Sequence, residues 1–297
     1  MKRSVIRSTI CLFVFSVPAA LPASAQTDEV QLKWKFREGQ QLSAMLEQKI
    51  DLQISVNGQT IRTKNNSSSW MRWNVRSVEN GKAEVAVTID RMTLDINTPA
   101  AAVLVDTDNK EQTSAAAETM AKGLRPLIGV EMSQTMLSSG LIEDVTIPDE
   151  ALTALKNVTG LRMGDFVKNL SKNSTLAFPD GPLKIGRSWT RSTVAPSPVG
   201  EVSVTHKYTY QGKKKVEGKE LHAFDADVKM KFANADGGPN IEIQEQSTAG
   251  TLYFDELAGR LNHSEIEQKV KMQISVGAQK IDQTLTQTAR FSMTESR

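Results

Sequence analysis

The chain has 297 residues, with 36 basic and 34 acidic side chains, and only 5% of its residues are aromatic. This near balance of charge gives no global reason to expect a nucleic-acid partner or an anionic membrane surface. The single cysteine, Cys11, lies inside a candidate export signal. Without that signal the chain can form no disulfide, and thiol catalysis is excluded. A hydrophobic core must therefore hold the fold together, and the length suffices to build one.

The first 25 residues have the pattern of a cleavable export signal. Three basic residues precede an apolar run over residues 8–20, and Ala23-Ser24-Ala25 matches a small-residue cleavage motif. The alternative is an uncleaved anchor, but the run is shorter than the roughly 20 residues that a span needs. We expect cleavage after Ala25 and a periplasmic or extracellular protein. The mature chain should then have no integral membrane span.

Residues 47–61, EQKIDLQISVNGQTI, predict a β-hairpin. Apolar side chains occupy every second position from Ile50 to Val56, which is typical of a strand with one buried and one solvated face. Asn57-Gly58 supplies the positive φ angles of a type I′ turn. The sequence therefore predicts long antiparallel strands joined by tight turns.

The strand after the next predicted turn, Asn80-Gly81, changes phase. Its apolar residues fall on odd positions over 85–89 and on even positions over 92–96. One extra residue near Asp90-Arg91 would keep both sets on the same face of the sheet. The pattern therefore predicts a β-bulge at this point.

The middle of the chain has a different pattern. Residues 107–122 predict a helix, with Asp108 in capping position. Residues 129–147 indicate a hairpin that turns near Ser138-Ser139-Gly140, and further helices follow over about 149–172. We expect this helical insert, over about 108–122 and 149–172, to pack on the apolar face of the sheet.

Residues 267–281, EQKVKMQISVGAQKI, nearly repeat residues 47–61. Nine of the 15 positions are identical at an offset of 220, and the same offset pairs Trp34 with Phe254. Alternating strands built from few residue types could match by chance, but the shared polar residues favour internal duplication. We expect an export signal at 1–25, a first β-meander with the helical insert at 26–175, and a second β-meander half at 176–297.

Catalytic and metal-binding motifs are sparse. The sequence contains no nucleophile elbow, and the histidines His206, His222 and His263 form no metal-binding motif. We interpret His206 as a strand residue and the other two as surface residues. Asp225 and Asp227 share one strand face, a spacing that glycosidase carboxylates could use, although a solvated face is the simpler interpretation. No cofactor or metal is predicted.

Methionine is the residue type that most suggests a binding site. Methionine fills irregular spaces and lines adaptable apolar pockets, although ordinary core filling is the simpler explanation. The candidate lining residues of an apolar ligand site are Met132, Met136, Met163, Phe166, Met230 and Met272.

Turn glycines and strand motifs recur in a recognisable order. They are Gly39-Gln40, Asn57-Gly58-Gln59-Thr60, Val87 to Met92, Leu127-Ile128-Gly129, Gly140 with Val145, Gly186 with Trp189, and Phe254-Asp255 with Gly259-Arg260-Leu261. In this order the chain resembles an uncharacterised family of secreted bacterial proteins classed as a domain of unknown function. The resemblance covers most of the mature chain. It implies a bacterial envelope or secreted setting and supplies no catalytic residues.

Taken together, the sequence predicts a mainly β (α+β) fold of long curved antiparallel sheets, with two related meanders and a helical insert on the apolar face. The leading functional hypothesis is a non-enzymatic envelope protein that binds a hydrophobic ligand, such as lipid, or a lipoprotein partner between sheet and helices. One alternative is a structural or protein-interaction module of the cell envelope. The third hypothesis is a hydrolase with an unrecognised site. A histidine close to acidic side chains in a pocket would favour it.

Overall fold

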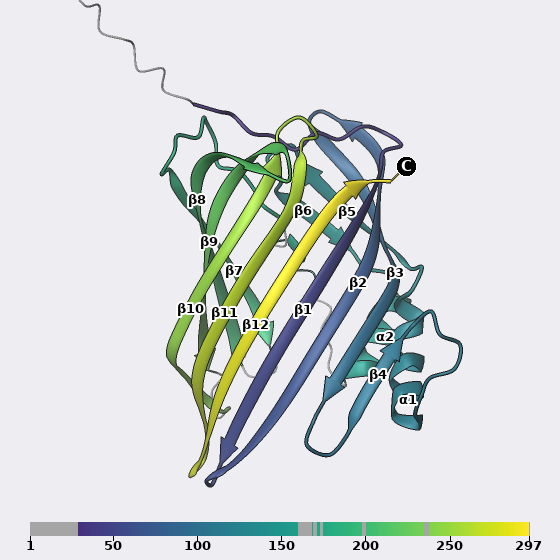
Figure 1. The fold of residues 1–297 in the computed structure, drawn as a ribbon, viewed down its shortest axis with the longest axis vertical. Helices are drawn as coiled ribbons and strands as arrows, with labels where there is room; N and C mark the ends of the chain where they lie inside the picture. Colours follow the sequence, from purple (N-terminus) through teal and green to yellow (C-terminus); the bar gives the residue numbers. More distant parts are fainter. Residues whose placement is uncertain are drawn as a thin grey trace, which may run out of the picture.

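A single twelve-stranded antiparallel sheet dominates the computed structural model (Figure 1). The structure describes residues 29–159, 175–197, 200–234 and 238–296, together with Lys168, Ser171 and Lys172, so the predicted export signal lies outside the described residues. The strands are β1 (Gln41–Val56), β2 (Gln59–Glu79), β3 (Lys82–Asn97), β4 (Ala102–Asp106), β5 (Glu131–Leu137), β6 (Ile142–Thr146), β7 (Ser188–Ser197), β8 (Gly200–Val216), β9 (Lys219–Asn234), β10 (Asn240–Asp255), β11 (Arg260–Val276) and β12 (Gln279–Glu295).

The strands follow the order β6-β5-β3-β2-β1-β12-β11-β10-β9-β8-β7, and β4 pairs with β3 outside this path. The long sheet curls, so that β5, β6 and β7 lie behind the front strands and β8 lies at the left edge in the view of Figure 1. Among the described strands, no pairing joins the two edge strands, β6 and β7. The fold is thus mainly β, as predicted, and its two halves share one curved sheet.

The hairpin turns have the conformations that their residues predict. Asn57 and Gly58 have φ angles of 50° and 80°, and Asn80 and Gly81 have 51° and 77°. Positive φ at both central residues defines a type I′ turn, whose twist matches that of the flanking strands. In the turn between β11 and β12, Gly277 has a φ of 58°.

The predicted bulge in β3 is confirmed. Trp70 pairs with Arg91, and the next residue of β2, Met71, pairs with Ile89. Asp90 is therefore the extra residue on β3, and the apolar residues on both sides of it keep to one face of the sheet.

The two similar peptides form neighbouring hairpins. Residues 47–61 span the turn from β1 to β2, and residues 267–281 span the turn from β11 to β12. Because β1 pairs with β12 along its length, the hairpins lie side by side in the middle of the sheet. The residues paired by the same offset also meet, since the rings of Trp34 and Phe254 pack edge to face with centroids 5.6 Å apart.

The two faces of the sheet differ in chemistry. The convex face carries ion pairs between strands, such as Arg290 with Glu265 at 2.6 Å and Lys271 with Glu245 at 2.5 Å. Such exposed pairs add little stability but keep this face solvated. The concave face carries the main hydrophobic core. The core therefore lies inside the curl of the sheet.

One end of the curled sheet is closed by the irregular segment at residues 29–40. The main-chain nitrogen of Trp34 donates to Ser138 O at 2.7 Å, and that of Lys35 donates to Gly259 O at 2.9 Å. The first contact is to the β5–β6 turn and the second is to the β10–β11 turn. This segment therefore ties the two halves of the sheet together.

A second irregular segment, residues 175–187, crosses the same region. The main-chain nitrogen of Phe178 donates to Ser139 O at 2.7 Å. The Phe178 ring packs edge to face on Phe254, with centroids 4.9 Å apart, and also contacts Phe224. Burial of these rings anchors the segment over the concave face.

The helical insert lies beside β4 and comprises α1 (Ala115–Leu124), the short 3-10 helix η1 (Arg125–Leu127) and α2 (Asp149–Thr159). Ala117, Ala121 and Leu124 of α1 are buried in the main core, and Ala151 of α2 joins them there. The small alanine side chains let the helices approach the sheet closely. The described part of the insert thus packs on the apolar face, as the sequence predicted. Residues 160–167 and 169–170 of the predicted insert lie outside the described residues.

The predicted start of the first helix, near Asp108, is wrong. The helix begins at Ala115, and its N-cap is Ser114, whose hydroxyl accepts a main-chain hydrogen bond. Before it, the Gln112 side chain hydrogen-bonds to both main-chain groups of Asp106 at 3.1 and 2.8 Å. These bonds offer the main chain an alternative to the helical pattern, so the preceding residues form turns.

Candidate ligand-binding cavity

A cavity of about 380 Å³ lies on the concave face, lined by strands from both halves of the sheet and by the two irregular segments. Its volume falls within the roughly 300–1,000 Å³ of known small-molecule sites. Its wall is mainly apolar, with aromatic rings and aliphatic or thioether side chains. The lining residues are Trp34, Leu46, Met71, Trp73, Val87, Met132, Ser133, Gln134, Val145, Ser171, Thr175, Leu176, His206, Tyr208, Leu252, Leu261, Ser264, Ile266, Ala289, Phe291 and Met293.

Strand pairing across the sheet produces this apolar wall. Trp73 of β2 lies opposite Val87 of β3, which lies opposite Met132 of β5. Side chains at paired positions of antiparallel strands point to the same face. A second row, with Phe291 of β12 opposite Leu46 of β1, continues the wall across the centre of the sheet. The alternation along each strand therefore determines which side chains line the cavity.

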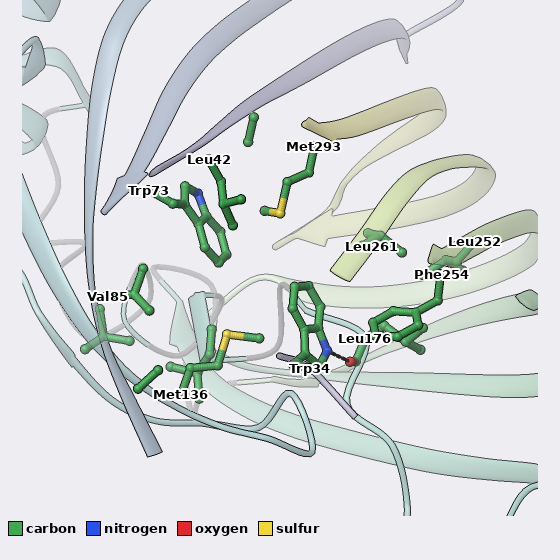
Figure 2. Close-up of a cluster of buried hydrophobic side chains, with 14 of the residues drawn as sticks. Trp34, Leu42, Trp73, Val85, Met136, Leu176, Leu252, Phe254, Leu261 and Met293 are labelled. Carbon is green, nitrogen blue, oxygen red and sulfur yellow. Dashed lines mark hydrogen bonds between the residues drawn. The ribbon is translucent and has the colours of Figure 1, made fainter. Parts of the chain in front are cut away.

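Figure 2 shows side chains from distant strands meeting in the core, with Trp73 and Met293 on one side and Trp34 on the other. These three residues also line the cavity. The Trp34 indole Nε1 donates a hydrogen bond of 2.9 Å to Leu176 O. This bond fixes the ring against the second irregular segment. Both irregular segments therefore contribute to the wall, and the sheet alone does not enclose the cavity.

Among the residues that the structure describes, two buried donors on residues of the wall have no hydrogen-bond partner. They are the indole Nε1 of Trp73 and the amide Nε2 of Gln134, on side chains of residues that are 7% and 8% exposed. A buried polar group without a partner carries a free-energy cost of about 1–3 kcal/mol. By contrast, the hydroxyl of Thr175 is satisfied, because it donates to Gly140 O at 2.6 Å. Both nitrogen atoms are also closed to the cavity itself, so the surface that a ligand would meet is mainly apolar.

His206 is the one titratable imidazole among the described lining residues. Burial lowers its pKa below the ordinary 6.5, and the positive charge of nearby Arg191 lowers it further. Its ring stacks on Tyr208 with centroids 6.1 Å apart. The side chain is therefore neutral at pH 7, and the wall has an imidazole without a charge there.

Acidification should destabilise the protein through His206. Because the folded-state pKa lies below the unfolded value of 6.5, the unfolded chain takes up a proton first as the pH falls. The free energy of unfolding should therefore decrease once the pH drops below about 6.5, down to the folded-state pKa. Buried His222, whose pKa is also lowered by burial, contributes in the same range.

Urea unfolding at several pH values between 7.5 and 5, for the wild type and His206→Gln, checks this expectation. On acidification, the free energy of unfolding should decrease less for the variant than for the wild type. The decrease that is due to His222 should remain in both proteins. An identical pH dependence in both proteins would contradict a lowered pKa at His206.

The six candidate lining residues fall into different places. Met132 lines the cavity, and Met136 is fully buried in the adjoining core. Met230 and Met272 belong to a separate apolar cluster around Val270, nearer the far ends of the strands. The remaining two lie outside the described residues, namely Met163 and Phe166.

Most of the wall consists of residues that the methionine pattern did not single out. Trp34, Trp73 and Phe291 provide large apolar surfaces, and Gln134 and His206 provide polar groups. Strand alternation indicates which residues share a face. It does not reveal that strands so distant in the sequence face one another across a cavity.

His222 is not a surface residue, contrary to the sequence interpretation. It is 1% exposed, and its ring nitrogens lie 2.7 Å from the Tyr210 hydroxyl and 2.9 Å from a Glu256 carboxylate oxygen. The sequence does indicate this burial. His222 and buried Phe224 lie two residues apart on β9, so their side chains point to the same face of the sheet. This histidine does meet an acidic side chain, but His222 is absent from the cavity wall described above.

Asp225 lies on the opposite face of the sheet from the cavity. It accepts a hydrogen bond of 2.5 Å from the Gln211 side chain, and with Asp227 it lines a shallow hollow beside Lys207. Within the described residues, no group of three or more histidine, cysteine or acidic side chains is arranged to hold a metal ion. No helix in the described part of the chain is long and apolar enough to cross a membrane.

Comparisons with known proteins give only weak likenesses. No family model and no curated protein matches the chain. A lipovitellin structure, described by its lipid–protein interactions, aligns with 89% of this chain and 26% of its own, at 13% identity and a TM-score of 0.46. The chain thus spans about a quarter of the length of that protein.

Two bacterial structures align over larger shares of their own length. An exported protein with a YmcC-like fold from Bacteroides fragilis aligns over 86% of this chain and 96% of its own, at 7% identity and a TM-score of 0.24. The hypothetical lipoprotein YmcC from Escherichia coli aligns over 80% and 85%, at 8% identity and a TM-score of 0.20. These scores are too low for any of the three to support an argument about function.

Proposed function

We propose that this chain is an exported, non-enzymatic binding protein that holds a hydrophobic ligand inside its curled sheet. The observation that carries the proposal is the apolar cavity of about 380 Å³, lined from both halves of the sheet. A core filled for stability alone would leave few spaces larger than a water molecule. The export signal and the membership of the uncharacterised secreted family are part of the same proposal.

The wall chemistry supports binding over catalysis. Among the described lining residues there is no lysine, arginine, aspartate or glutamate. Acid–base or nucleophilic catalysis needs an activated group placed beside the substrate. His206 is the nearest candidate, and no acidic side chain is found with it in the described wall. The cavity is therefore suited to burying apolar surface, which stabilises a complex by about 25 cal/mol per Å².

Ligand binding can be tested with the protein purified from its native host. Native mass spectrometry followed by solvent extraction should reveal a co-purified apolar molecule. The delipidated protein should then bind the neutral fluorescent probe N-phenyl-1-naphthylamine, with a change in emission from Trp34 and Trp73 in the cavity wall. A protein that carries no ligand and binds no apolar probe would overturn the proposal.

A second candidate is a protein-interaction module of the cell envelope. Edge strand β7 pairs on one side with β8, and no second pairing of β7 is found among the described residues. Val194 on this strand is 53% exposed. An unpaired edge with exposed apolar residues can accept a strand from another chain. Hydrogen exchange of β7 with and without envelope extract would reveal such pairing as new protection.

A further inference from the structure

Arg191 is a charged residue on the concave face of the sheet, beside the cavity. It lies on β7 opposite His206 of β8, and side chains at paired positions of antiparallel strands point to the same face. His206 and the next inward residue of β8, Tyr208, both line the cavity. The Arg191 side chain is partly buried, so its charge is partly removed from water.

Electrostatic effects place the guanidinium of Arg191 close to both wall residues. Burial lowers the pKa of His206 and raises that of Tyr208 to about 12, and the positive charge of Arg191 has an additional lowering effect on each. Because such an effect weakens with distance, the charge lies near the imidazole and the phenol. An arginine side chain keeps this charge at neutral pH.

No acidic side chain shares this face of the sheet from β7 to β11. In this described part of the chain, the inward positions carry no aspartate, glutamate or lysine, and no second arginine. They are every second residue over 189–195 of β7, 202–210 of β8, 222–232 of β9, 246–254 of β10 and 264–274 of β11. Cations of the convex face, by contrast, form ion pairs such as that of Arg290 with Glu265. Arg191 therefore has no carboxylate partner on its own face of these strands.

This isolated cation favours an anionic group in the ligand. A partly desolvated charge without a counter-ion is unfavourable, and an oxyanion placed beside it would offset that cost. A guanidinium also presents paired N–H donors that match the geometry of a carboxylate or a phosphate. Arg191 thus offers a charged head a partner that the apolar wall does not.

An apolar path leads from Arg191 across the sheet. The row of paired positions that contains Tyr208 runs across β9 and β10 to Ile266 of β11 and Ala289 of β12. Both of these residues line the cavity. A hydrocarbon chain that lies along this row would bury its surface against the wall while its head stays beside Arg191.

We propose that the cavity binds an anionic amphiphile, whose carboxylate or phosphate head pairs with Arg191 beside His206 and Tyr208 and whose hydrocarbon chain lies along the apolar wall. This inference rests on the proposed function and specifies its ligand class.

The test compares three amphiphiles of equal chain length as competitors of N-phenyl-1-naphthylamine, each below its micelle concentration: sodium dodecanoate, dodecyl phosphate and neutral dodecanol. With wild-type protein at pH 7.5, at least one anion should compete about tenfold better than dodecanol, the gain expected of a hydrogen bond between charged groups. The preferred anion distinguishes a fatty carboxylate from a lipid phosphate. Acetate and inorganic phosphate, which lack the chain, should not compete at the same concentrations.

Arg191→Gln removes the charge, so the preference for the anion over dodecanol should disappear. The preference is a ratio measured within one protein, which separates loss of the charge from any general change in the cavity. Arg191→Lys keeps a positive charge and should retain part of the preference. Arg290→Gln removes a cation from the convex face and is the matched control, which should keep the wild-type preference. Circular dichroism checks that each variant is folded.

The outcomes separate the two proposals. If the probe binds but dodecanol competes as well as both anions, the inference about Arg191 is wrong and the apolar binding function stands. The same holds if folded Arg191→Gln keeps the preference, if Arg290→Gln loses it equally, or if acetate or inorganic phosphate displaces the probe. If neither the probe nor any of the three amphiphiles binds, the proposed function itself fails.

Discussion

Gly140→Ala should lower the free energy of unfolding by about 3 kcal/mol or more. Gly140 has a φ of +90°, and an added Cβ would lie 2.4 Å from both Leu176 O and the Trp34 indole nitrogen. Those two atoms form the 2.9 Å hydrogen bond that fixes Trp34 beside the cavity. The methyl group would therefore break this bond or displace the main chain of the second irregular segment. Urea unfolding followed by far-ultraviolet circular dichroism measures the loss.

Gly58→Ala is the matched control for this variant. Gly58 has a φ of +80°, but an added Cβ there meets no atom within 4 Å. This substitution should cost only the strain of a left-handed alanine, about 1–2 kcal/mol. If both variants lose the same stability, steric overlap at Gly140 is not the cause, and the tight contact with Trp34 would be disproved.

Ala289→Phe should lower the affinity for an apolar ligand by at least about tenfold, because the new ring would occupy space that the ligand needs. Ala289 lines the cavity on β12 and lies opposite Gln48 of β1 and Ile266 of β11. A phenyl group at this position points into the concave face. Titration with N-phenyl-1-naphthylamine measures the change, and circular dichroism shows whether the sheet is retained.

Ala249→Phe controls for the addition of an aromatic ring to the same sheet. Ala249 on β10 is exposed and belongs to the solvated convex face. Its substitution should leave probe affinity as in the wild type. Equal affinity of folded Ala289→Phe and wild type would show that the ligand binds elsewhere on the protein.

Local features of the fold could be predicted from the sequence because they depend on neighbouring residues. Asn57-Gly58 adopts its turn from intrinsic backbone preference, and Asp90 forms the bulge because the apolar alternation changes phase there. The predicted start of the first helix is wrong because both Asp108 and Ser114 are residue types that can cap a helix. Ser114 caps the first turn of the helix, and the hydrogen bond from the Gln112 side chain to Asp106 O stabilises turns in the residues before it.

The cavity could be predicted only in general terms. An apolar sheet face is evident from alternation, and Met132 does line the cavity. The enclosing parts are irregular segments, whose placement depends on single contacts such as that of Trp34 with Leu176. No periodic pattern marks such segments. The unpartnered state of Gln134 likewise depends on which side chains surround it in the folded chain.

The central strand pair has a consequence for how the protein assembles. β1 and β12, the first and last strands of the sheet, pair with each other at its middle. During synthesis β1 is made before β12. The edge of β1 that pairs with β12 therefore stays unpaired until β12 has been made. Such late, non-local pairing slows folding and leaves an aggregation-prone edge. Loss of β12 would leave the facing edges of β1 and β11 unpaired and would split the sheet at its centre.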